Sequence, residues 1–268
     1  MISSQEGLSG VALITGAGSG IGKGTAFSFA SAGCQRLFLG DVNLPGLEKT
    51  EAELKAEFPA VDVRIHKVDI SYEHSVDAFV DAAVAAFGRV DYACNIAGWA
   101  PQREPIAEVP VATYDRVVNI DEYGTWLCHR AEIRQMVKQT PLPGAGSVRG
   151  SIVSVASLSG INASPGMSTY CAAKFGTVAI CKSDALDYGP QGIRVNVVCP
   201  GLTDTPLYWW NTPDTFTEMM IGRTPLRRLG TVDDLGKAIL WLSSPNAAFV
   251  TGVVVPVDGG LVLQRRGM

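Results

Sequence analysis

The chain has 268 residues, of which 47% are hydrophobic and 18% are charged, and its formal net charge is −4. The charges are spread along the sequence, so no block of Lys and Arg indicates a nucleic-acid or membrane surface. A chain of this length and apolar content can bury one substantial core.

Short apolar runs alternate with longer segments of helical periodicity. Most runs are nearly continuous and rich in Val and Ile, which suits strands buried on both faces of a parallel sheet. The predicted strands are 11–15, 36–41, 61–69, 90–97, 151–157, 193–200 and 253–259. The predicted helices are roughly 20–33, 43–58, 72–87, 112–139, 168–188 and 231–243. This alternation predicts an α/β fold with right-handed crossovers and helices on both faces of one sheet.

Two segments break the rhythm. Residues 139–150 form a Pro- and Gly-rich stretch that we expect to be an exposed loop. Residues 202–230 are rich in aromatic side chains and Met, and loops of that length are uncommon without a role. Because there is neither an internal repeat nor a linker, residues 1–268 are expected to form a single domain.

The N-terminus and the cysteines both favour a cytoplasmic protein. The segment MISSQEGLSG lacks the basic and apolar regions of a secretory signal, and no apolar run approaches a membrane span of about twenty residues. The six cysteines form no CxxC pair and several lie in apolar segments, as buried thiols do in a reducing compartment. The three histidines are scattered, so we expect no metal site.

A glycine cluster, TGAGSGIG, begins at Thr15 directly after the first predicted strand and opens the first helix. Glycine is costly to order, so a cluster indicates a tight turn or the close approach of a ligand to the backbone. A helix N-terminus offers free N–H groups and a positive dipole end, which suits a pyrophosphate.

Asp41 ends the second predicted strand, about nineteen residues past Gly22. A carboxylate there can accept both ribose hydroxyls of an adenosine, and it would repel a 2′-phosphate. No Arg or Lys directly follows Asp41 or replaces Ser19 to receive that phosphate. NAD is therefore favoured over NADP.

Ser157, Tyr170 and Lys174 form a second constellation. Ser157 ends the fifth predicted strand, and Tyr170 and Lys174 are four residues apart on one face of a predicted helix. An ammonium nearby lowers the pKa of a tyrosine from its usual value of about 10. Ser157 could then donate to a substrate oxygen while Tyr170 moves the proton. An exposed pair on a helix surface would explain Tyr170 and Lys174 by themselves. It would not explain why they occur together with a glycine-rich nucleotide-binding loop.

Together these motifs resemble the short-chain dehydrogenase/reductase family, in its classical branch, over essentially the whole chain. The matching segments are TGAGSGIG, NIAG at 95–98, Ser157, YCAAK at 170–174, PG at 200–201 and VTGVVVPVDGG at 250–260. The resemblance implies a single-domain Rossmann fold with a doubly wound, seven-stranded parallel sheet. It also implies a homotetramer or homodimer paired through the helices that carry 124–137 and 169–188.

The resemblance assigns a cofactor contact to each matching position. It places the pyrophosphate at Gly16, Ser19, Gly20, Ile21 and Gly22, the adenosine ribose at Asp41 and the adenine at Asp69. It places the nicotinamide ribose at Asn95, Ala97, Gly98, Tyr170 and Lys174, and the carboxamide after Pro200 and Gly201, at Thr203 and Thr205.

One position departs from the family pattern. The family usually has an asparagine three residues before the glycine that is Gly124 here, and the sequence VVNIDEYGTW has Asp121 at that place. Either Asp121 takes the catalytic role, holding the water that links Lys174 to solvent, or the helix is shifted and Asn119 supplies it.

In the family, the segment corresponding to 202–230 forms a lid over the substrate. Its aromatic and Met residues here are Tyr208, Trp209, Trp210, Phe216, Met219 and Met220, and Trp99 would face the same cleft. Such a lid suits a bulky apolar substrate, although some of these residues could instead pack in a subunit interface. No Arg or Lys is clearly committed to a substrate carboxylate or phosphate, so a terpenoid, steroid-like or polyketide alcohol of secondary metabolism fits best.

The leading hypothesis is therefore an NAD-dependent dehydrogenase of a bulky hydrophobic secondary alcohol, without nucleic-acid or membrane partners. An NADPH-dependent ketoreductase with the same site is the first alternative. A redox-neutral enzyme or a non-catalytic nucleotide-binding protein are the others.

Overall fold

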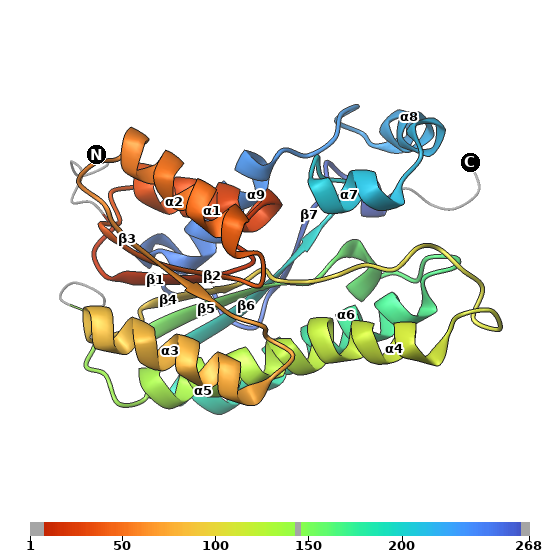
Figure 1. Cartoon of the computed structure of the whole chain (residues 1–268). Coiled ribbons are helices and arrows are strands. Elements are labelled where there is room, and N and C mark those ends of the chain that lie inside the picture. The colour runs from red at the N-terminus through yellow and green to blue at the C-terminus, as the bar shows by residue number, and fades with distance from the viewer. Residues whose placement is uncertain (1–7, 143–145, 264–268) are drawn as a thin grey trace.

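In the computed structural model, residues 8–142 and 146–263 are described (Figure 1). The first seven residues, part of the segment read above for a secretory signal, lie outside these ranges, as do residues 143–145 of the predicted Pro- and Gly-rich loop. Within the described residues, no helix is long and apolar enough to cross a membrane.

One seven-stranded parallel sheet forms the centre of the molecule, in the order β3-β2-β1-β4-β5-β6-β7. The strands are β1 (Val11–Thr15), β2 (Arg36–Asp41), β3 (Asp62–Lys67), β4 (Tyr92–Asn95), β5 (Gly150–Val155), β6 (Ile193–Pro200) and β7 (Val254–Val257). Four predicted strands extend further than these, because the chain leaves the sheet at Lys67, Asn95, Val155 and Val257. The order reverses direction between β1 and β4, which confirms the doubly wound Rossmann fold.

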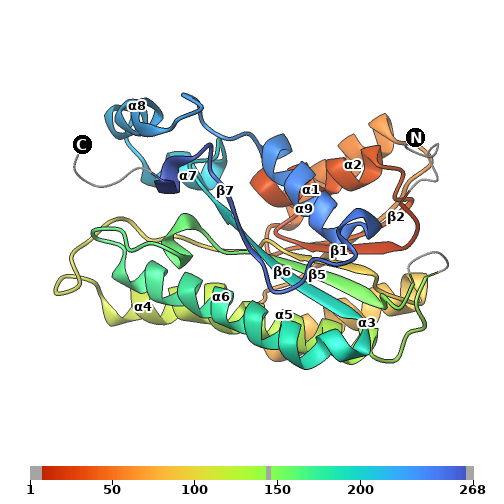
Figure 2. The ribbon, with the colours of Figure 1, turned by 180° about the vertical axis from the view of Figure 1, so that it is seen from behind.

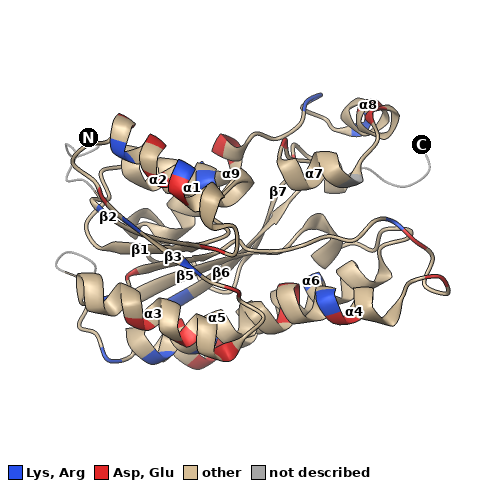
Figure 3. Ribbon diagram, viewed as in Figure 1, with Lys and Arg blue, Asp and Glu red and all other residues tan. Residues whose placement is uncertain are grey.

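Helices cover both faces of the sheet (Figures 1 and 2). One layer contains α1 (Gly20–Ser31), α2 (Leu44–Glu57) and α9 (Val232–Ser243), and the other contains α3 (Glu73–Phe87), α4 (Val111–Val117), α5 (Gly124–Met136) and α6 (Ser168–Tyr188). Every residue of β5 and β6 is buried, which explains the continuous apolar runs in their sequences. Acidic and basic residues are interspersed over both layers (Figure 3).

Two stretches differ from the predicted elements. The helix predicted at 112–139 is divided into α4, a π-helical turn at Val118–Tyr123 and α5. A π turn adds a residue to the helical repeat, so it rotates the side chains that follow, and periodicity alone does not reveal it. The segment 202–230 contains two short helices, α7 (Pro206–Asn211) and α8 (Asp214–Arg223), which stand above the carboxyl ends of β6 and β7 (Figure 1).

Short 3₁₀ turns complete the described elements. They lie at Leu158–Gly160, Gly189–Gln191, Pro245–Ala247 and Leu261–Leu263. The first of them follows Ser157 and precedes α6, so it connects the predicted serine to the helix of Tyr170 and Lys174.

Candidate active site

A cleft of about 810 Å³ opens at the carboxyl ends of the strands, where the sheet order reverses. α/β folds of this type bind their ligands at that point. Its walls include many of the predicted site residues: Gly16, Ser19, Gly20, Ile21, Gly22, Asp41, Asp69, Ala97, Gly98, Trp99, Thr205 and Trp210. They also include Asn119, the alternative to Asp121, and residues that the sequence did not single out: Val42, Val68, Ile70, Ser71, Ile96, Arg116, Ile120, Pro206 and Leu207.

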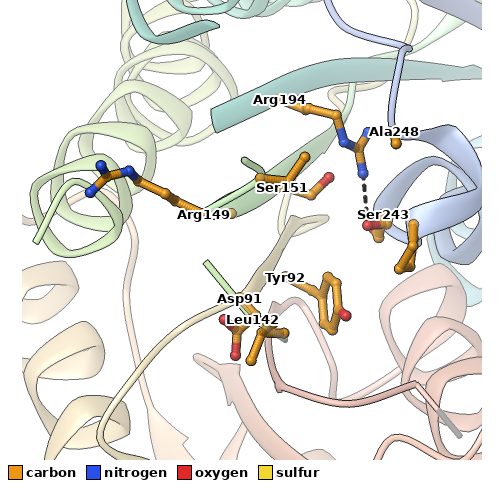
Figure 4. A pocket seen from close by; sticks show the side chains of 11 residues that line it. Asp91, Tyr92, Leu142, Arg149, Ser151, Arg194, Ser243 and Ala248 are labelled. Carbon is orange, nitrogen blue, oxygen red and sulfur yellow. Dashed lines mark hydrogen bonds between the residues drawn. The ribbon is translucent and has the colours of Figure 1, made fainter. Parts of the chain in front are cut away.

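A second cavity lies at the opposite end of the strands and is too small for a substrate. It measures about 30 Å³, which leaves room for about two water molecules. Tyr92, Ser151 and Arg194 are among its walls, and Arg194 donates to the Ser243 carbonyl at 2.8 Å (Figure 4). The large cleft is therefore the candidate active site.

The glycine turn has a packing reason as well as a ligand-binding one. A Cβ on Gly22 would lie 2.1 Å from the Gly16 carbonyl oxygen, and one on Gly16 would lie 2.7 Å from the Ala97 nitrogen. Gly16 and Gly20 also have positive φ angles, of 71° and 50°. Ser19, the N-cap of α1, makes no side-chain cap, so its helix presents first-turn N–H groups toward the cleft. This arrangement fits a pyrophosphate.

Asp41 lines the cleft and is held in one orientation. Its Oδ2 accepts from the Gly18 N–H and its Oδ1 accepts from the Asn43 N–H, both at 2.9 Å. A carboxylate oxygen has more than one lone pair, so both oxygens can still accept from ribose hydroxyls.

Three basic residues bear on the choice of cofactor. Arg36 begins β2 and lies five residue steps before Asp41, a distance of roughly 16 Å along the strand. Lys23 forms an ion pair with Glu53 at 2.5 Å. Lys67 was missed by sequence reasoning because it belongs to another strand: it ends β3 in register with Asp41, is exposed, and does not line the cleft.

Lys174 is buried behind Gly98 of the cleft wall and makes three contacts. Its Nζ lies 2.9 Å from Asp121 Oδ1, donates to the Val155 carbonyl at 3.2 Å, and lies 5.6 Å from the centre of the Tyr170 ring. The Ser157 Oγ accepts from the Ser159 N–H at 3.1 Å, and the Ser157 side chain lies near the half-buried Tyr170 and acts to lower the pKa of its hydroxyl. The fold thus brings together the serine, tyrosine and lysine that the sequence predicted as a group.

The structure distinguishes the two residues considered for the asparagine position. Asp121 is completely buried beside Lys174, whereas Asn119 is exposed on the cleft wall. Counting back from Gly124 therefore finds the side chain that meets the lysine. Asp121 contacts Lys174 directly.

Burial and charge act in opposite directions on these groups. Burial raises the pKa of Tyr170, the Lys174 ammonium lowers it and the Asp121 carboxylate raises it again, with a net increase. Burial lowers the pKa of Lys174, but Asp121 and Tyr170 more than offset this, so the lysine stays charged at neutral pH. Burial raises the pKa of Asp121, and Lys174 opposes that change.

Aromatic side chains form the outer wall of the cleft. Trp99 and Trp210 lie with ring centroids 6.3 Å apart, and the Arg116 guanidinium is 4.1 Å from the Trp99 ring centre. The sequence motifs did not indicate a cation in this part of the wall. Arg116, Asn119 and Ile120 share one helical face toward the cleft, so the spacing i, i+3, i+4 could have indicated it.

The other lid residues predicted for substrate binding do not line the cleft. Tyr208 hydrogen-bonds Thr217 at 2.8 Å, Trp209 donates to Asp204 at 2.7 Å, and Met219 is 46% exposed. Only Trp210 of the predicted lid side chains lies on the wall.

Six predicted cofactor residues do not line the cleft: Asn95, Pro200, Gly201, Thr203, Tyr170 and Lys174. The predicted catalytic residues Ser157 and Asp121 do not line it either. Asn95 is buried and donates to Glu132 Oε2 at 2.9 Å, a partner that the sequence did not suggest. Pro200 ends β6 and Gly201 follows it. Thr203 is buried, and its hydroxyl donates to the Gly201 carbonyl at 3.3 Å. In the described part of the chain, no group of three or more His, Cys, Asp and Glu side chains could hold a metal ion.

Known proteins resemble this chain over nearly all of its length. A family model described as enoyl-(acyl carrier protein) reductase matches residues 16–262. The short-chain dehydrogenase srdC of Neurospora crassa is 37% identical, over 97% of this chain and 99% of its own. The crystal structure of levodione reductase superposes with a TM-score of 0.89 and 33% identity, covering 95% of this chain and 98% of the other. A 3-ketoacyl-(acyl-carrier-protein) reductase from Brucella melitensis, complexed with NADH, gives 0.85 and 34%, covering 94% and 98%.

Proposed function

The chain belongs to the short-chain dehydrogenase/reductase family, and we propose that it is an NAD-dependent dehydrogenase of a bulky, hydrophobic secondary alcohol. Membership makes it an NAD(P)-dependent oxidoreductase that acts on alcohol and ketone groups. The observation that carries the proposal is one cleft with Asp41 on its wall and the Lys174 and Asp121 pair, with Tyr170 beside it, directly behind Gly98 of the same wall.

The choice of NAD rests on Asp41. Its carboxylate is fixed by two backbone N–H groups and lines the cleft, with the apolar Val42 beside it. A 2′-phosphate there would lose a hydrogen bond and meet a like charge. The first turn of α1 would hold the pyrophosphate, and Asn95, Ala97 and Gly98 would border the nicotinamide ribose.

Bound NAD would supply the hydride acceptor, and Ser157, Tyr170 and Lys174 would position and transfer the proton. Ser157 would donate a hydrogen bond to the substrate oxygen and hold it near Tyr170. The phenolate oxygen of Tyr170 would take the hydroxyl proton as the carbinol carbon becomes a ketone. Lys174 favours that phenolate because its ammonium lies beside the ring.

The proposed substrate is apolar because Trp99 and Trp210 form part of the cleft wall. Large aromatic faces recognise bulky hydrocarbon through contact area. We propose that α7 and α8 form the lid of this pocket. Arg116 adds one cation at its rim, which accommodates a polar substituent without changing the apolar character of the wall.

Two further properties are part of the proposal. All six cysteines are free and buried, which supports the reducing environment of the cytoplasm.

The outer surface of α5 and α6 exposes Trp126 and Phe175, at 44% and 46%, which supports a homodimer or homotetramer formed through these helices.

Lys67 gives a specific reason to keep an NADPH-dependent ketoreductase as second candidate. It ends β3 in register with Asp41, so its side chain is the nearest cation in the sheet to a 2′-phosphate.

The test is an activity panel. Hydrophobic secondary alcohols with NAD or NADP, and ketones with NADH or NADPH, are assayed by nicotinamide absorbance, with Tyr170→Phe as control. Turnover with NAD supports the proposal, and turnover only with NADPH favours the second candidate.

A further inference from the structure

The buried ion pair of Asp121 and Lys174 changes the charge that Tyr170 experiences. Resting on the proposed function, we propose that Asp121 is a positioning residue that offsets the Lys174 ammonium and keeps Tyr170 protonated to higher pH than the lysine alone would allow. The consequence is a dehydrogenase whose alcohol oxidation requires more alkaline conditions, and whose ketone reduction persists further toward alkaline pH.

The carboxylate of Asp121 is held in a fixed position. Its two oxygens accept from the Trp99 N–H at 3.2 and 3.3 Å, and Oδ1 lies 2.9 Å from Lys174 Nζ. A Cβ on Gly98 would lie 2.7 Å from the same oxygen, so the carboxylate packs directly against this backbone. The Thr177 hydroxyl donates to the Asp121 carbonyl at 2.8 Å, which ties the π-helical turn to α6.

A charge this close alters what the lysine does to its neighbour. An ammonium with a carboxylate at 2.9 Å presents a dipole to the phenol, while an ammonium beside a neutral amide presents a full positive charge. The site is buried, so solvent screens the difference little. Removing the charge of Asp121 should therefore change the ionisation of Tyr170 more than removing the charge of an exposed carboxylate.

Two thiols also face the pair, one from β6 and one from α6. Cys199 of β6 faces Lys174, and burial raises the pKa of its thiol to about 11, so it is neutral there. Cys171 of α6 faces Tyr170. The charged neighbours of Tyr170 in this arrangement are Lys174 and Asp121, with opposite effects.

The direction of the pH effect follows from the proton that Tyr170 carries. In oxidation, the substrate O–H bond breaks and the proton joins the phenolate, so activity rises as Tyr170 deprotonates. In reduction, the phenol O–H bond breaks and the proton joins the carbonyl oxygen, so activity falls as Tyr170 deprotonates. Removing the negative charge of Asp121 should move both transitions to lower pH.

The decisive variant is Asp121→Asn, measured with NAD and the best alcohol and ketone of the panel. The amide keeps the size of the side chain, and its oxygen can still accept from Trp99 and Lys174. We expect the acid limb of kcat/KM for oxidation, and the alkaline limb for reduction, to move down by about one pH unit or more. The matched control is Asp115→Asn, which removes an exposed carboxylate from α4 and should leave both limbs in place.

Unmoved limbs in Asp121→Asn, or limbs that move to higher pH, would overturn the proposal. So would a variant that binds NAD but has no turnover, because the carboxylate would then be required rather than modulating. An ultraviolet titration measures the same ionisation without turnover. The Tyr170 signal is the difference between proteins with and without Tyr170→Phe, recorded in the wild type and in Asp121→Asn. If no substrate is found, the proposed function fails, while this titration still decides the role of Asp121.

Discussion

The Gly18 N–H donates to the Asp41 carboxylate at 2.9 Å, which joins the glycine turn to the end of β2. A Cβ on Gly18 would lie 3.0 Å from the same oxygen, so the two residues are in close contact. Asp41 therefore holds the turn in place in addition to the ribose contact proposed for it. A substitution at this residue affects cofactor choice and loop position together.

We expect the wild type to bind NAD more tightly than NADP by at least about 2–3 kcal/mol, or roughly 30- to 150-fold. Asp41→Asn keeps an oxygen for the Gly18 N–H and removes the charge, so it should lose most of this discrimination. Asp41→Ala also loses the link to the turn and should weaken both cofactors. Calorimetric titration of the two oxidised cofactors measures these affinities. Equal wild-type affinities would favour the NADPH ketoreductase.

Tyr170→Phe removes the proton acceptor but leaves most cofactor contacts. We expect kcat to fall by about 10²- to 10⁴-fold, since general acid–base groups contribute on that scale. The dissociation constant for NAD should change little, as followed by calorimetry. A variant with more than half of the wild-type rate would remove Tyr170 from the mechanism.

Asp121→Ala leaves the buried Lys174 ammonium without its carboxylate. Breaking a buried ion pair in this way costs about 3–5 kcal/mol of stability. Asp121→Asn keeps a hydrogen-bond acceptor and should cost less, with substantial activity retained. Urea unfolding of both variants gives the difference. If both match the wild type while Asn119→Ala is inactive, the exposed asparagine is the functional residue.

Trp210 and Trp209 are neighbours with different surroundings, which makes them a matched pair. Trp210 lies on the cleft wall against Trp99, while Trp209 donates to Asp204. Trp210→Ala should raise KM for bulky apolar alcohols by about 2- to 12-fold, because an aromatic pair contributes roughly 0.5–1.5 kcal/mol beyond its buried area. Trp209→Ala should leave KM near the wild-type value. Equal increases in KM for the two variants would mean that the substrate contact is not specific to Trp210.

Trp126 is 44% exposed on α5 and stacks with Tyr123, with ring centroids 6.0 Å apart. If α5 forms a subunit interface, Trp126→Glu places a charge in it and should dissociate the oligomer, while Trp126→Phe should not. Light scattering at micromolar concentration measures the mass. A monomeric wild type would refute the proposed assembly.

Local spacing carried much of the prediction. The apolar runs of β5 and β6 predict buried parallel strands because each residue there is covered on one face or the other. Tyr170 and Lys174 share a helical face because they are one turn apart, and α6 has the predicted bounds of 168–188. Relationships of this kind depend only on the geometry of a single helix or strand, so they can be predicted from the sequence.

Contacts between distant elements required the tertiary structure. The pairing of Asp121 with Lys174, the approach of Trp99 to Trp210 and the register of Lys67 with Asp41 each join segments far apart in the chain. Helical periodicity carries no information on which faces meet, and the π turn before α5 rotates side chains in a way that a regular repeat does not anticipate. The residue types of the site were therefore set by sequence motifs, whereas the charge around Tyr170 was decided by packing between helices.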